Sequence, residues 1–396
     1  MTGSCRPGPL PGAGLLDDRT RELDGCCREL AAGFRDAAMA LDRDPDAIAG
    51  YLHLPGVRLN QFAHIPPEYR PELDFPPRVL DAAATSLGWA VLWEQLGYGD
   101  PGVTLAGPRP GLFGEVLSAL TGQRQSGHYF RRLATAPSNT FFALTEPGKG
   151  SAAAELETTL APATDGDGWI LNGEKCYVGN GARAAVGVVM CRRGTGLFGI
   201  EAVALESGTP GFSAELLPAM GLRGARISRL RFDNVRIPRE NVLGGQLAPT
   251  RRGLAGVLPV LNRSRPPVAA MAIGCAKAVC DYVAQQRPTL AKAGRLRLED
   301  MLDRIDATRR LIHRACVAID HGRMDSDRAA AVKVQAAHIA EEATLLAAEL
   351  LGPASLIEHP WMEKTYRDVR AFEFTEGTTN IHRLSLFRCL RKNAYP

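Results

Sequence analysis

The chain has 396 residues, of which 45% are hydrophobic and 23% are charged, and its formal net charge is +4. This composition is that of a globular protein that can bury a sizeable core in two or three domains. It argues against nucleic acid as a partner, because no basic run is dense enough, and against a membrane span, because no apolar stretch approaches ~18 residues.

The cysteine pattern indicates a reducing compartment. Nine cysteines are scattered along the chain without a C-x-x-C pair, so neither a disulfide framework nor a zinc site is expected. The eight histidines show no metal-ligand spacing, and we expect no bound metal. The N-terminus carries no long apolar segment and hence no signal peptide. We therefore expect a cytoplasmic protein that begins with a flexible arm, residues 1–14.

Residues 15–138 are predicted to form an N-terminal helical domain. Their Ala- and Leu-rich runs, such as RVLDAAATSLGWAVLWEQLG at 78–97, repeat at helical spacing, and proline clusters mark the loops between them. Residues 139–247 change to short strands separated by turn signals, among them DGDG at 165–168 and Asn172-Gly173. This second segment is predicted to be a β domain.

One stretch of the β domain imitates a nucleotide-binding motif. GTGLFG at 194–199 matches G-x-G-x-x-G, but the residues that follow, IEAVALES, are typical of a strand and not of a helix. The phosphate-binding form of this motif needs a helix N-terminus after the glycines. We therefore interpret the stretch as a glycine-rich hairpin turn.

Residues 248–396 are predicted to form a C-terminal helical bundle. Three long alanine-rich segments carry an apolar stripe at helical spacing, and with a last helix they would make a four-helix bundle. Pro266-Pro267 is expected to open the first of these helices, and Gly322 and Gly352 are expected to end the second and third.

Two stretches indicate chemistry. FFALTEPGKGS at 141–151 ends a strand at Thr145-Glu146, and its glycines and hydroxyls suit an anionic or heteroaromatic ligand, although a plain turn would look similar. RAFEFTEGTTNIHR at 370–383 places Glu376 after two phenylalanines and before an amphipathic run. Either this glutamate only precedes a helix capped by Thr378 or Thr379, or it is a base that meets an organic substrate away from water.

Five stretches, in this order over about residues 90–390, resemble motifs of the acyl-CoA dehydrogenase family. ALTEPGKGS resembles its T-E-P-x-x-G-S-D loop, and DGWILNGEKCYVGNG resembles its L-N-G-x-K hairpin. RLRFDNVRIPRENVLG resembles its F-D-x-V strand, RSRPPVAAMAIGCAKA the start of its bundle, and RDVRAFEFTEGTTNIHR its E-G-T segment. The resemblance implies an α+β multi-domain fold with an N-terminal helical domain, a middle β-barrel-like or sandwich domain and a C-terminal four-helix bundle.

The resemblance also implies FAD as the cofactor, bound where the β domain meets the bundle and partly across a subunit interface. Arg287 and Thr289 in QRPTLAK are similar to the family residues that reach the FAD of the neighbouring subunit. The other residues implied to bind the cofactor are Leu144, Thr145, Ser151, Tyr177, Val178, Gly179, Thr378 and Asn380.

The reaction implied is the dehydrogenation of an acyl thioester, in which Glu376 removes the α-proton and flavin N5 takes the β-hydrogen as hydride. The residues implied to bind the substrate are Ser151, Asn262, Arg265 and Gly377. The expected partners are a thioester of CoA or of an acyl carrier protein, and an electron-transfer flavoprotein or other electron acceptor. The expected assembly is a homodimer or homotetramer.

Several positions depart from the family pattern. Ala152 replaces an aspartate, Gly179 replaces a threonine or serine, Asn262 replaces an aspartate, and Pro353 stands where a glycine normally approaches FAD. These departures suggest a divergent member in bacterial secondary metabolism whose acyl group rides on a carrier protein. The arginine-rich stretch RGARISRLR at 223–231 would then be a basic rim that steers such an acidic partner.

Two other functions stay open from the sequence. One is a flavin-dependent monooxygenase or oxidase on the same fold, which Gly179 weakly favours and Glu376 argues against. The other is a non-catalytic binding protein that has kept the fold.

Overall fold

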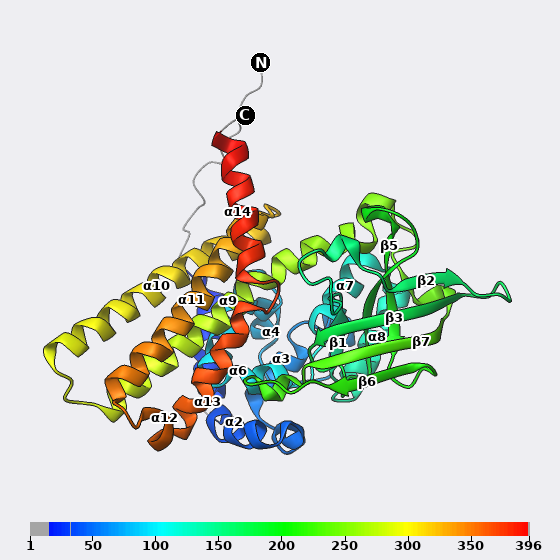
Figure 1. The fold of residues 1–396 in the computed structure, drawn as a ribbon. Helices are drawn as coiled ribbons and strands as arrows, with labels where there is room; N and C mark the ends of the chain where they lie inside the picture. The colour runs from blue at the N-terminus through cyan, green and yellow to red at the C-terminus, as the bar shows by residue number, and fades with distance from the viewer. Residues whose placement is uncertain (1–15, 32, 395–396) are drawn as a thin grey trace.

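The computed structural model describes residues 16–31 and 33–394, and it has three parts in the predicted order of helices, sheet and helices (Figure 1). The predicted fold class is therefore confirmed. The predicted N-terminal arm, residues 1–14, lies outside the described residues.

The first part is helical and forms one wall of the molecule. Its central helix, α5 (Ser86–Gly99), is apolar on nearly every side and packs along the first helix of the C-terminal part. Thr85 caps α5, because its hydroxyl accepts a hydrogen bond from the N–H of Gly88 at 2.9 Å. The other helices are α1 (Asp18–Leu30), α2 (Phe34–Arg43), α3 (Pro55–Phe62), α4 (Pro77–Ala83), α6 (Pro101–Ala106), α7 (Gly111–Leu120) and α8 (Gln123–Thr135).

The middle part forms, within the described residues, one mixed sheet of eight strands in the order β6-β7-β3-β2-β4-β5-β8, and β1 pairs in parallel with β4. The GTGLFG stretch lies between the antiparallel strands β4 and β5, so the predicted hairpin is confirmed. The strands are β1 (Thr140–Ala143), β2 (Thr159–Pro162), β3 (Trp169–Val178), β4 (Val186–Arg192), β5 (Ile200–Glu206), β6 (Phe212–Leu216), β7 (Ser228–Ile237) and β8 (Val242–Leu243).

The two faces of β4 contribute to two different cores. Val188 and Met190 join the large core shared with the helices, whereas Val189 and Cys191 join a smaller core on the opposite face. Side chains alternate between the faces of a strand, so a strand covered on both faces is apolar throughout, as β4 is. The sheet is thereby fixed against the helical parts.

The third part is the expected bundle. Helices α9 (Gly253–Gln286), α10 (Lys292–Asp320) and α11 (Ser326–Leu351) pack along one another, and α14 (Thr379–Ala394) packs against α11 and rises away from the body (Figure 1). The short helices α12 (Ser355–Glu358) and α13 (Pro360–Asp368) connect α11 to the turn before α14. Gly322 and Gly352 follow α10 and α11 with positive φ, as predicted.

The prediction that Pro266-Pro267 opens α9 is wrong, because the helix begins at Gly253 and both prolines lie inside it. A proline removes one main-chain hydrogen bond, but its φ is itself helical. The cost is offset here because the residues around the prolines are deeply buried.

The helical stretch Pro249–Gln286 is long and apolar enough to cross a membrane, yet 78% of its most apolar window is buried within the protein, as in a core helix.

A buried ionic cluster joins the three parts. The ammonium of Lys364 in α13 lies 2.5 Å from carboxylate oxygens of both Asp100 and Asp368. Asp100 also caps α6 by accepting from the N–H of Val103 at 2.8 Å, and Asp368 accepts from the N–H of Leu222 at 2.6 Å. One lysine therefore ties the first helical part, the sheet and the bundle together.

Candidate active site

The turn that carries Glu376 lies between α13 and α14 and has an unusual backbone. Val369–Glu373 form a short 3-10 helix, and Glu376 and Gly377 then adopt φ angles of 56° and 98°. A non-glycine residue in this left-handed region costs about 1–3 kcal/mol, and such residues cluster at functional sites. Only glycine fits at position 377, because a Cβ there would lie 2.9 Å from His382 Nε2.

Side-chain donors hold the carbonyl groups of this turn. The ammonium of Lys333 donates to the carbonyls of Glu373 at 2.9 Å and Gly377 at 2.7 Å. The carbonyl of Glu376 itself lies 3.4 Å from Nε of Arg265 and 3.1 Å from a ring nitrogen of His382. The surrounding helices thus fix the strained conformation.

Two main-chain N–H groups of the same turn are not used in hydrogen bonds within the described residues. Among the described residues, those of Glu376 and Gly377 have no hydrogen-bond acceptor. Donors that are fixed in place and unused are suited to a developing oxyanion, such as the oxygen of a polarised thioester carbonyl.

The carboxyl group of Glu376 is shifted toward its neutral form. Burial raises its pKa above the ordinary value, while Arg265, a 3.2 Å hydrogen bond from Ser264, Lys333 and Arg109 oppose that rise. The residue is nevertheless only half-buried. A carboxyl group that is largely surrounded by protein but still reachable from solvent is suited to act as a general base with a raised pKa.

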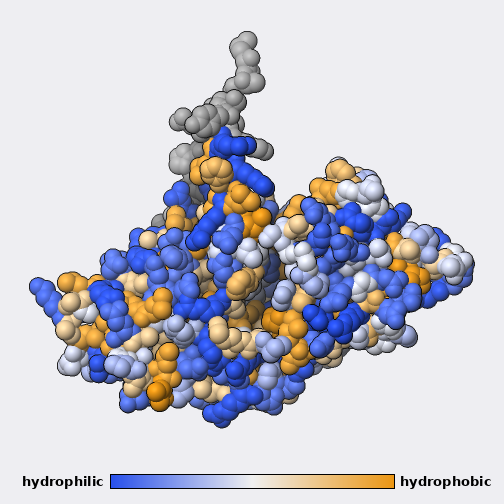
Figure 2. All heavy atoms as spheres, in the orientation of Figure 1, coloured by the Kyte–Doolittle hydropathy of each residue, from blue (hydrophilic) through white to orange (hydrophobic). Residues whose placement is uncertain are grey.

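Figure 2 shows that the molecule is hollowed between the helical bundle and the middle part, next to α14. Arg109, in the loop between α6 and α7, comes close enough to Glu376 for each charge to affect the pKa of the other. Its guanidinium donates to the carbonyls of Thr104 at 3.0 Å and Leu105 at 2.9 Å and lies over the ring of Trp93. Burial lowers the pKa of Arg109 to about 10.

The predicted cofactor residues of the middle part are brought together by β3. The N–H of Cys176 donates to the carbonyl of Thr145 at 2.8 Å, and the buried Lys175 donates to the carbonyl of Leu144 and to Glu146, both at 2.9 Å. The loop that begins at Leu144 is therefore fixed beside the end of β3, which carries Tyr177, Val178 and Gly179.

The end of β3 reaches the same α6–α7 region as Arg109. Asn180 donates from its side-chain amide to the carbonyl of Leu105 at 3.0 Å, the carbonyl that also accepts from Arg109. Tyr177 has a φ of 60° and is 65% exposed, and a Cβ at Gly179 would meet only the carbonyl oxygen of Ala225, at 4.0 Å. An exposed aromatic ring beside open space is suited to a flat ligand.

The remaining predicted residues divide into two groups. Thr378 caps α14 by accepting from the N–H of Ile381 at 3.2 Å, and Asn380 is exposed at the start of that helix. The predicted cap by Thr378 is thus present, and it leaves the carboxyl of Glu376 free to act as a base. Ser151 is exposed at the end of its loop, and Asn262 accepts a hydrogen bond from Arg265.

Arg287 and Thr289 do not join this site. Both are exposed beyond the C-terminal end of α9, roughly 22 residues or about 33 Å of helix from Arg265. Gly352, just before Pro353, lies beside Arg287, since a Cβ there would be 4.0 Å from its guanidinium. Arg287, Thr289 and Pro353 therefore lie in a region of the molecule separate from the site around Glu376.

Sequence reasoning missed four residues around Glu376. Ser264, Lys333 and His382 form hydrogen bonds with the turn, and Arg109 acts on Glu376 through its charge. Lys333 had a detectable signal: it is a lone lysine on the apolar stripe of the alanine-rich helix α11. Among the described residues, no group of three or more His, Cys, Asp or Glu side chains could hold a metal ion.

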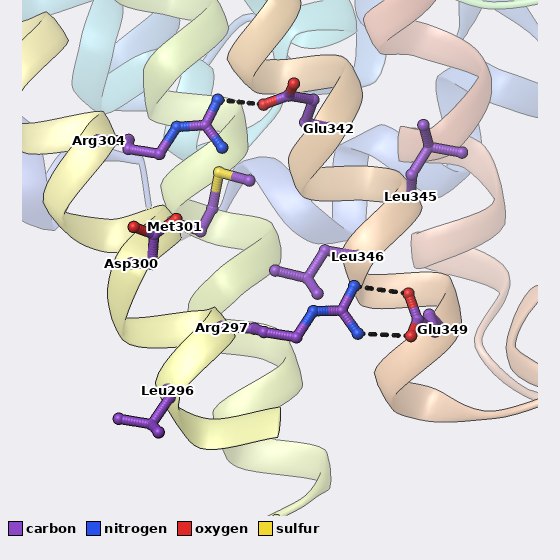
Figure 3. A pocket seen from close by; sticks show the side chains of 9 residues that line it. All are labelled: Leu296, Arg297, Asp300, Met301, Arg304, Glu342, Leu345, Leu346 and Glu349. Atoms are coloured by element: carbon purple, nitrogen blue, oxygen red, sulfur yellow. Dashed lines mark hydrogen bonds and ion pairs between the residues drawn. The ribbon is translucent and has the colours of Figure 1, made fainter. Parts of the chain in front are cut away.

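A second depression lies on the outer face between α10 and α11 (Figure 3). Ion pairs of Arg297 with Glu349, at 2.7 Å, and of Arg304 with Glu342 cross it, and the exposed Leu296 and Leu345 border it. It contains none of the predicted site residues.

Comparison with known proteins agrees with this architecture. Residues 141–235 match the acyl-CoA dehydrogenase middle domain, and residues 251–390 match the acyl-CoA dehydrogenase C-terminal domain. An acryloyl-CoA reductase (NADH) of Anaerotignum propionicum is 31% identical over 282 residues, which are 68% of this chain and 71% of the relative. A probable acyl-CoA dehydrogenase of Bacillus subtilis is 29% identical over 335 residues, 81% of this chain and 86% of the relative.

Solved structures show the same fold. Butyryl-CoA dehydrogenase from Megasphaera elsdenii has a TM-score of 0.81 at 23% identity, covering 95% of this chain and 99% of its own. The prolyl acyl carrier protein oxidase AnaB has a TM-score of 0.81 at 22% identity, covering 95% and 100%. The fold and the sequence matches define an FAD-dependent oxidoreductase. The chain belongs to the acyl-CoA dehydrogenase family.

The residues present fit the flavin ring of FAD. The space left by Gly179 next to the exposed Tyr177, and the loop at Leu144 and Thr145 fixed beside it, form a place for a flat heteroaromatic group. These residues and Val178 would hold the ring, where FAD supplies a two-electron acceptor. The region at Arg287 is too far along α9 to hold the same molecule from one chain.

Proposed function

We propose that this protein dehydrogenates an acyl thioester, with Glu376 as the base that removes the proton from the carbon next to the thioester carbonyl. The hydrogen on the following carbon leaves as hydride, which bound FAD accepts, and a carbon–carbon double bond forms between the two carbons. The observation that carries this proposal is the carboxyl of Glu376, which is desolvated and has a raised pKa but remains reachable from a cleft.

The turn would also assist the reaction electrostatically. The α-hydrogen of a thioester is a weak acid, so negative charge must be stabilised on the carbonyl oxygen as the proton leaves. The unused N–H groups of Glu376 and Gly377 are donors for that charge. Arg265 adds a positive charge beside the base, and Ser264 orients one carboxylate oxygen.

The thioester is carried by CoA or by an acyl carrier protein, in secondary metabolism. The chemistry at Glu376 is the same for both carriers, and proteins named for each share this fold. The arginine-rich stretch does not make the free basic rim that we expected, because these arginines pair with acids of the chain itself. Arg229 lies 2.8 Å from Glu174, Arg231 lies 3.5 Å from Glu215, and Arg223 and Arg226 face Asp42 and Asp46.

We further propose a cytoplasmic homodimer or homotetramer that passes electrons to an electron-transfer flavoprotein or other acceptor. The assembly is supported by the separate region at Arg287 and by the exposed apolar side chains Leu384, Phe387 and Leu390 along α14. The depression between α10 and α11, where exposed leucines border two ion pairs, offers a second surface (Figure 3).

An oxidase on the same fold is the second candidate, and the open space at Gly179 favours it. In an oxidase the reduced flavin would pass its electrons to oxygen, and the presence of Glu376 argues against this alternative. Hydrogen peroxide formed in proportion to product in air would identify it.

The test of the base is Glu376→Gln, which keeps the shape of the side chain but cannot accept the proton. With acyl thioesters of CoA and of carrier protein, the anaerobic bleaching of bound flavin is expected to slow by about 10²–10⁴-fold. Glu373→Gln is the matched control, because Glu373 lies in the same turn and bonds Thr379 instead of facing the cleft. Undiminished bleaching by Glu376→Gln would overturn the proposal.

A further inference from the structure

Lys333 is buried beneath the turn that carries the proposed base. It lies in α11, only 1% of the residue is exposed, and its ammonium donates to two main-chain carbonyls, those of Glu373 and Gly377. Both acceptors are neutral, so its positive charge is not cancelled by the groups that it bonds.

Burying a lysine to provide hydrogen bonds to two carbonyls costs the free energy of desolvating its ammonium. Burial penalises the charged form and lowers the pKa of Lys333 to about 8, while the nearby carboxylates of Glu373 and Glu376 oppose the shift. A buried lysine without a bonded counter-charge is disfavoured on stability grounds alone. Its geometry relative to Glu376 offers a functional reason for its presence.

The two accepting carbonyls lie on either side of Glu376 in the chain, three residues before it and one residue after it. Lys333 therefore holds the chain on both sides of Glu376, whose φ is 56°. These two carbonyls face α11, and the carbonyl of Glu376, which shares its peptide with the N–H of Gly377, faces Arg265 and His382. Within this fixed turn the N–H groups of Glu376 and Gly377 have no acceptor among the described residues.

We propose that Lys333 is the positioning residue of the base: its ammonium holds the turn so that the carboxylate of Glu376 and the free N–H groups of Glu376 and Gly377 face the cleft together. This inference rests on the proposed role of Glu376. Lys333 does not touch the substrate in this scheme, and it acts through the turn and through its charge.

The charge of Lys333 adds to those of its neighbours. Arg265 of α9 and Arg109 of the α6–α7 loop also favour the carboxylate form of Glu376, together with the Ser264 hydroxyl. His382 of α14 bonds the carbonyl of Glu376, and burial lowers its pKa to about 4, so it is neutral at physiological pH. Loss of Lys333 therefore removes one of three positive charges near the base.

The experiment compares Lys333→Met, Lys333→Gln and Lys333→Arg in the FAD-loaded protein. Lys333→Met removes both hydrogen bonds and the charge, and we expect kcat to fall about 10²-fold, the scale of a displaced catalytic group. The acid limb of the pH profile of kcat should move to higher pH in Lys333→Met and Lys333→Gln and should stay in place in Lys333→Arg. Amide hydrogen exchange of residues 374–378 should accelerate in Lys333→Met.

Thr344→Val is the matched control, because Thr344 is equally buried on α11 and bonds only its own helix, at the carbonyl of Glu341. It should leave the acid limb and the exchange of the turn unchanged. If Lys333→Met does not fold, Lys333→Gln, which retains an amide donor, gives the same comparison with a smaller loss of kcat.

The outcomes separate this inference from the function on which it rests. Unchanged kcat and an unmoved acid limb in a folded Lys333→Met or Lys333→Gln protein, together with an inactive Glu376→Gln, would overturn the role of Lys333 alone. Undiminished turnover by Glu376→Gln would overturn the base itself, whatever the lysine variants do.

Discussion

Two buried lysines of the C-terminal part have opposite surroundings. Lys364 lies between the carboxylates of Asp100 and Asp368, and although burial alone would lower its pKa, these partners raise it. Lys333 has two carbonyls in place of carboxylates, and burial lowers its pKa to about 8. The positive charge of Lys364 is neutralised by the carboxylates that it bonds. The positive charge of Lys333 has no bonded counter-charge and acts on the groups around it.

The difference separates a structural site from a functional one. The cluster at Lys364 connects α6, the sheet and α13, and its one ammonium is bonded to both carboxylates, which also accept from main-chain N–H groups. The region of Glu376 concentrates positive charge around one strained carboxylate and leaves N–H donors unused. Charges and N–H donors that are fixed in place without a bonded partner are typical of catalytic sites.

The largest expected effect comes from breaking the structural cluster. Lys364→Met leaves two facing carboxylates buried without a cation, and we expect a loss of about 3–5 kcal/mol in the free energy of unfolding. Denaturant unfolding measures this loss. The acid limb of the pH profile should stay in place for the folded fraction, because the groups with the largest effects on the pKa of Glu376 do not include Lys364.

Lys333→Met gives the reverse pattern, with a small change in stability relative to Lys364→Met and a large change in kcat. A destabilisation by Lys364→Met of less than about 1 kcal/mol, the scale of a single surface pair, would contradict the contrast between the two lysines.

The order of the three parts was predictable because each has its own periodicity, and the periods of helix and strand differ along the chain. The start of α9 was not predictable, since a pair of prolines usually marks the start of a helix. Only burial in the assembled core keeps Pro266 and Pro267 inside α9. The eight-stranded sheet and its register likewise depend on pairings between distant strands.

The candidate site was predictable where its residues are contiguous. Glu376, Gly377 and Thr378 belong to one motif, and Leu144 to Ser151 belong to another. Lys333 and Arg109 come from helices and loops far away in sequence, and only the fold brings them to the turn. The arginines at 223–231 were misjudged because their acidic partners, such as Asp42 and Glu215, lie elsewhere in the chain.

The pH dependence of the reaction should reflect the raised pKa of Glu376. The carboxylate form is the active one, so kcat/KM should fall as the pH drops through a value above the ordinary 4.5. Asn262→Asp sharpens this test, because Arg265 donates to the side-chain oxygen of Asn262. A carboxylate there would partly cancel the charge of Arg265 and move the acid limb to higher pH, by about half a pH unit or more.

Gln285→Glu is the control for this variant, since it adds the same charge at the exposed far end of α9. Its acid limb should coincide with that of the unmodified protein. An acid limb that stays in place in Asn262→Asp would show that the charge of Arg265 does not act on the base.

The smallest expected effect is at Gly179, where the structure allows a side chain. A Cβ there meets only the carbonyl oxygen of Ala225 at 4.0 Å, and Gly179 has no positive φ, so Gly179→Thr should change the free energy of unfolding by less than about 0.5 kcal/mol. The added hydroxyl can donate one hydrogen bond and fills space in the proposed flavin site. We expect reoxidation of the bound flavin by oxygen to slow by about 2- to 10-fold, the range of one hydrogen bond. Gly208→Thr, at an equally open turn of the same part, is the control in stopped-flow measurements. An unchanged rate in Gly179→Thr would mean that the main-chain N–H of residue 179 already serves the flavin, and the oxidase alternative would then lose the observation that favours it.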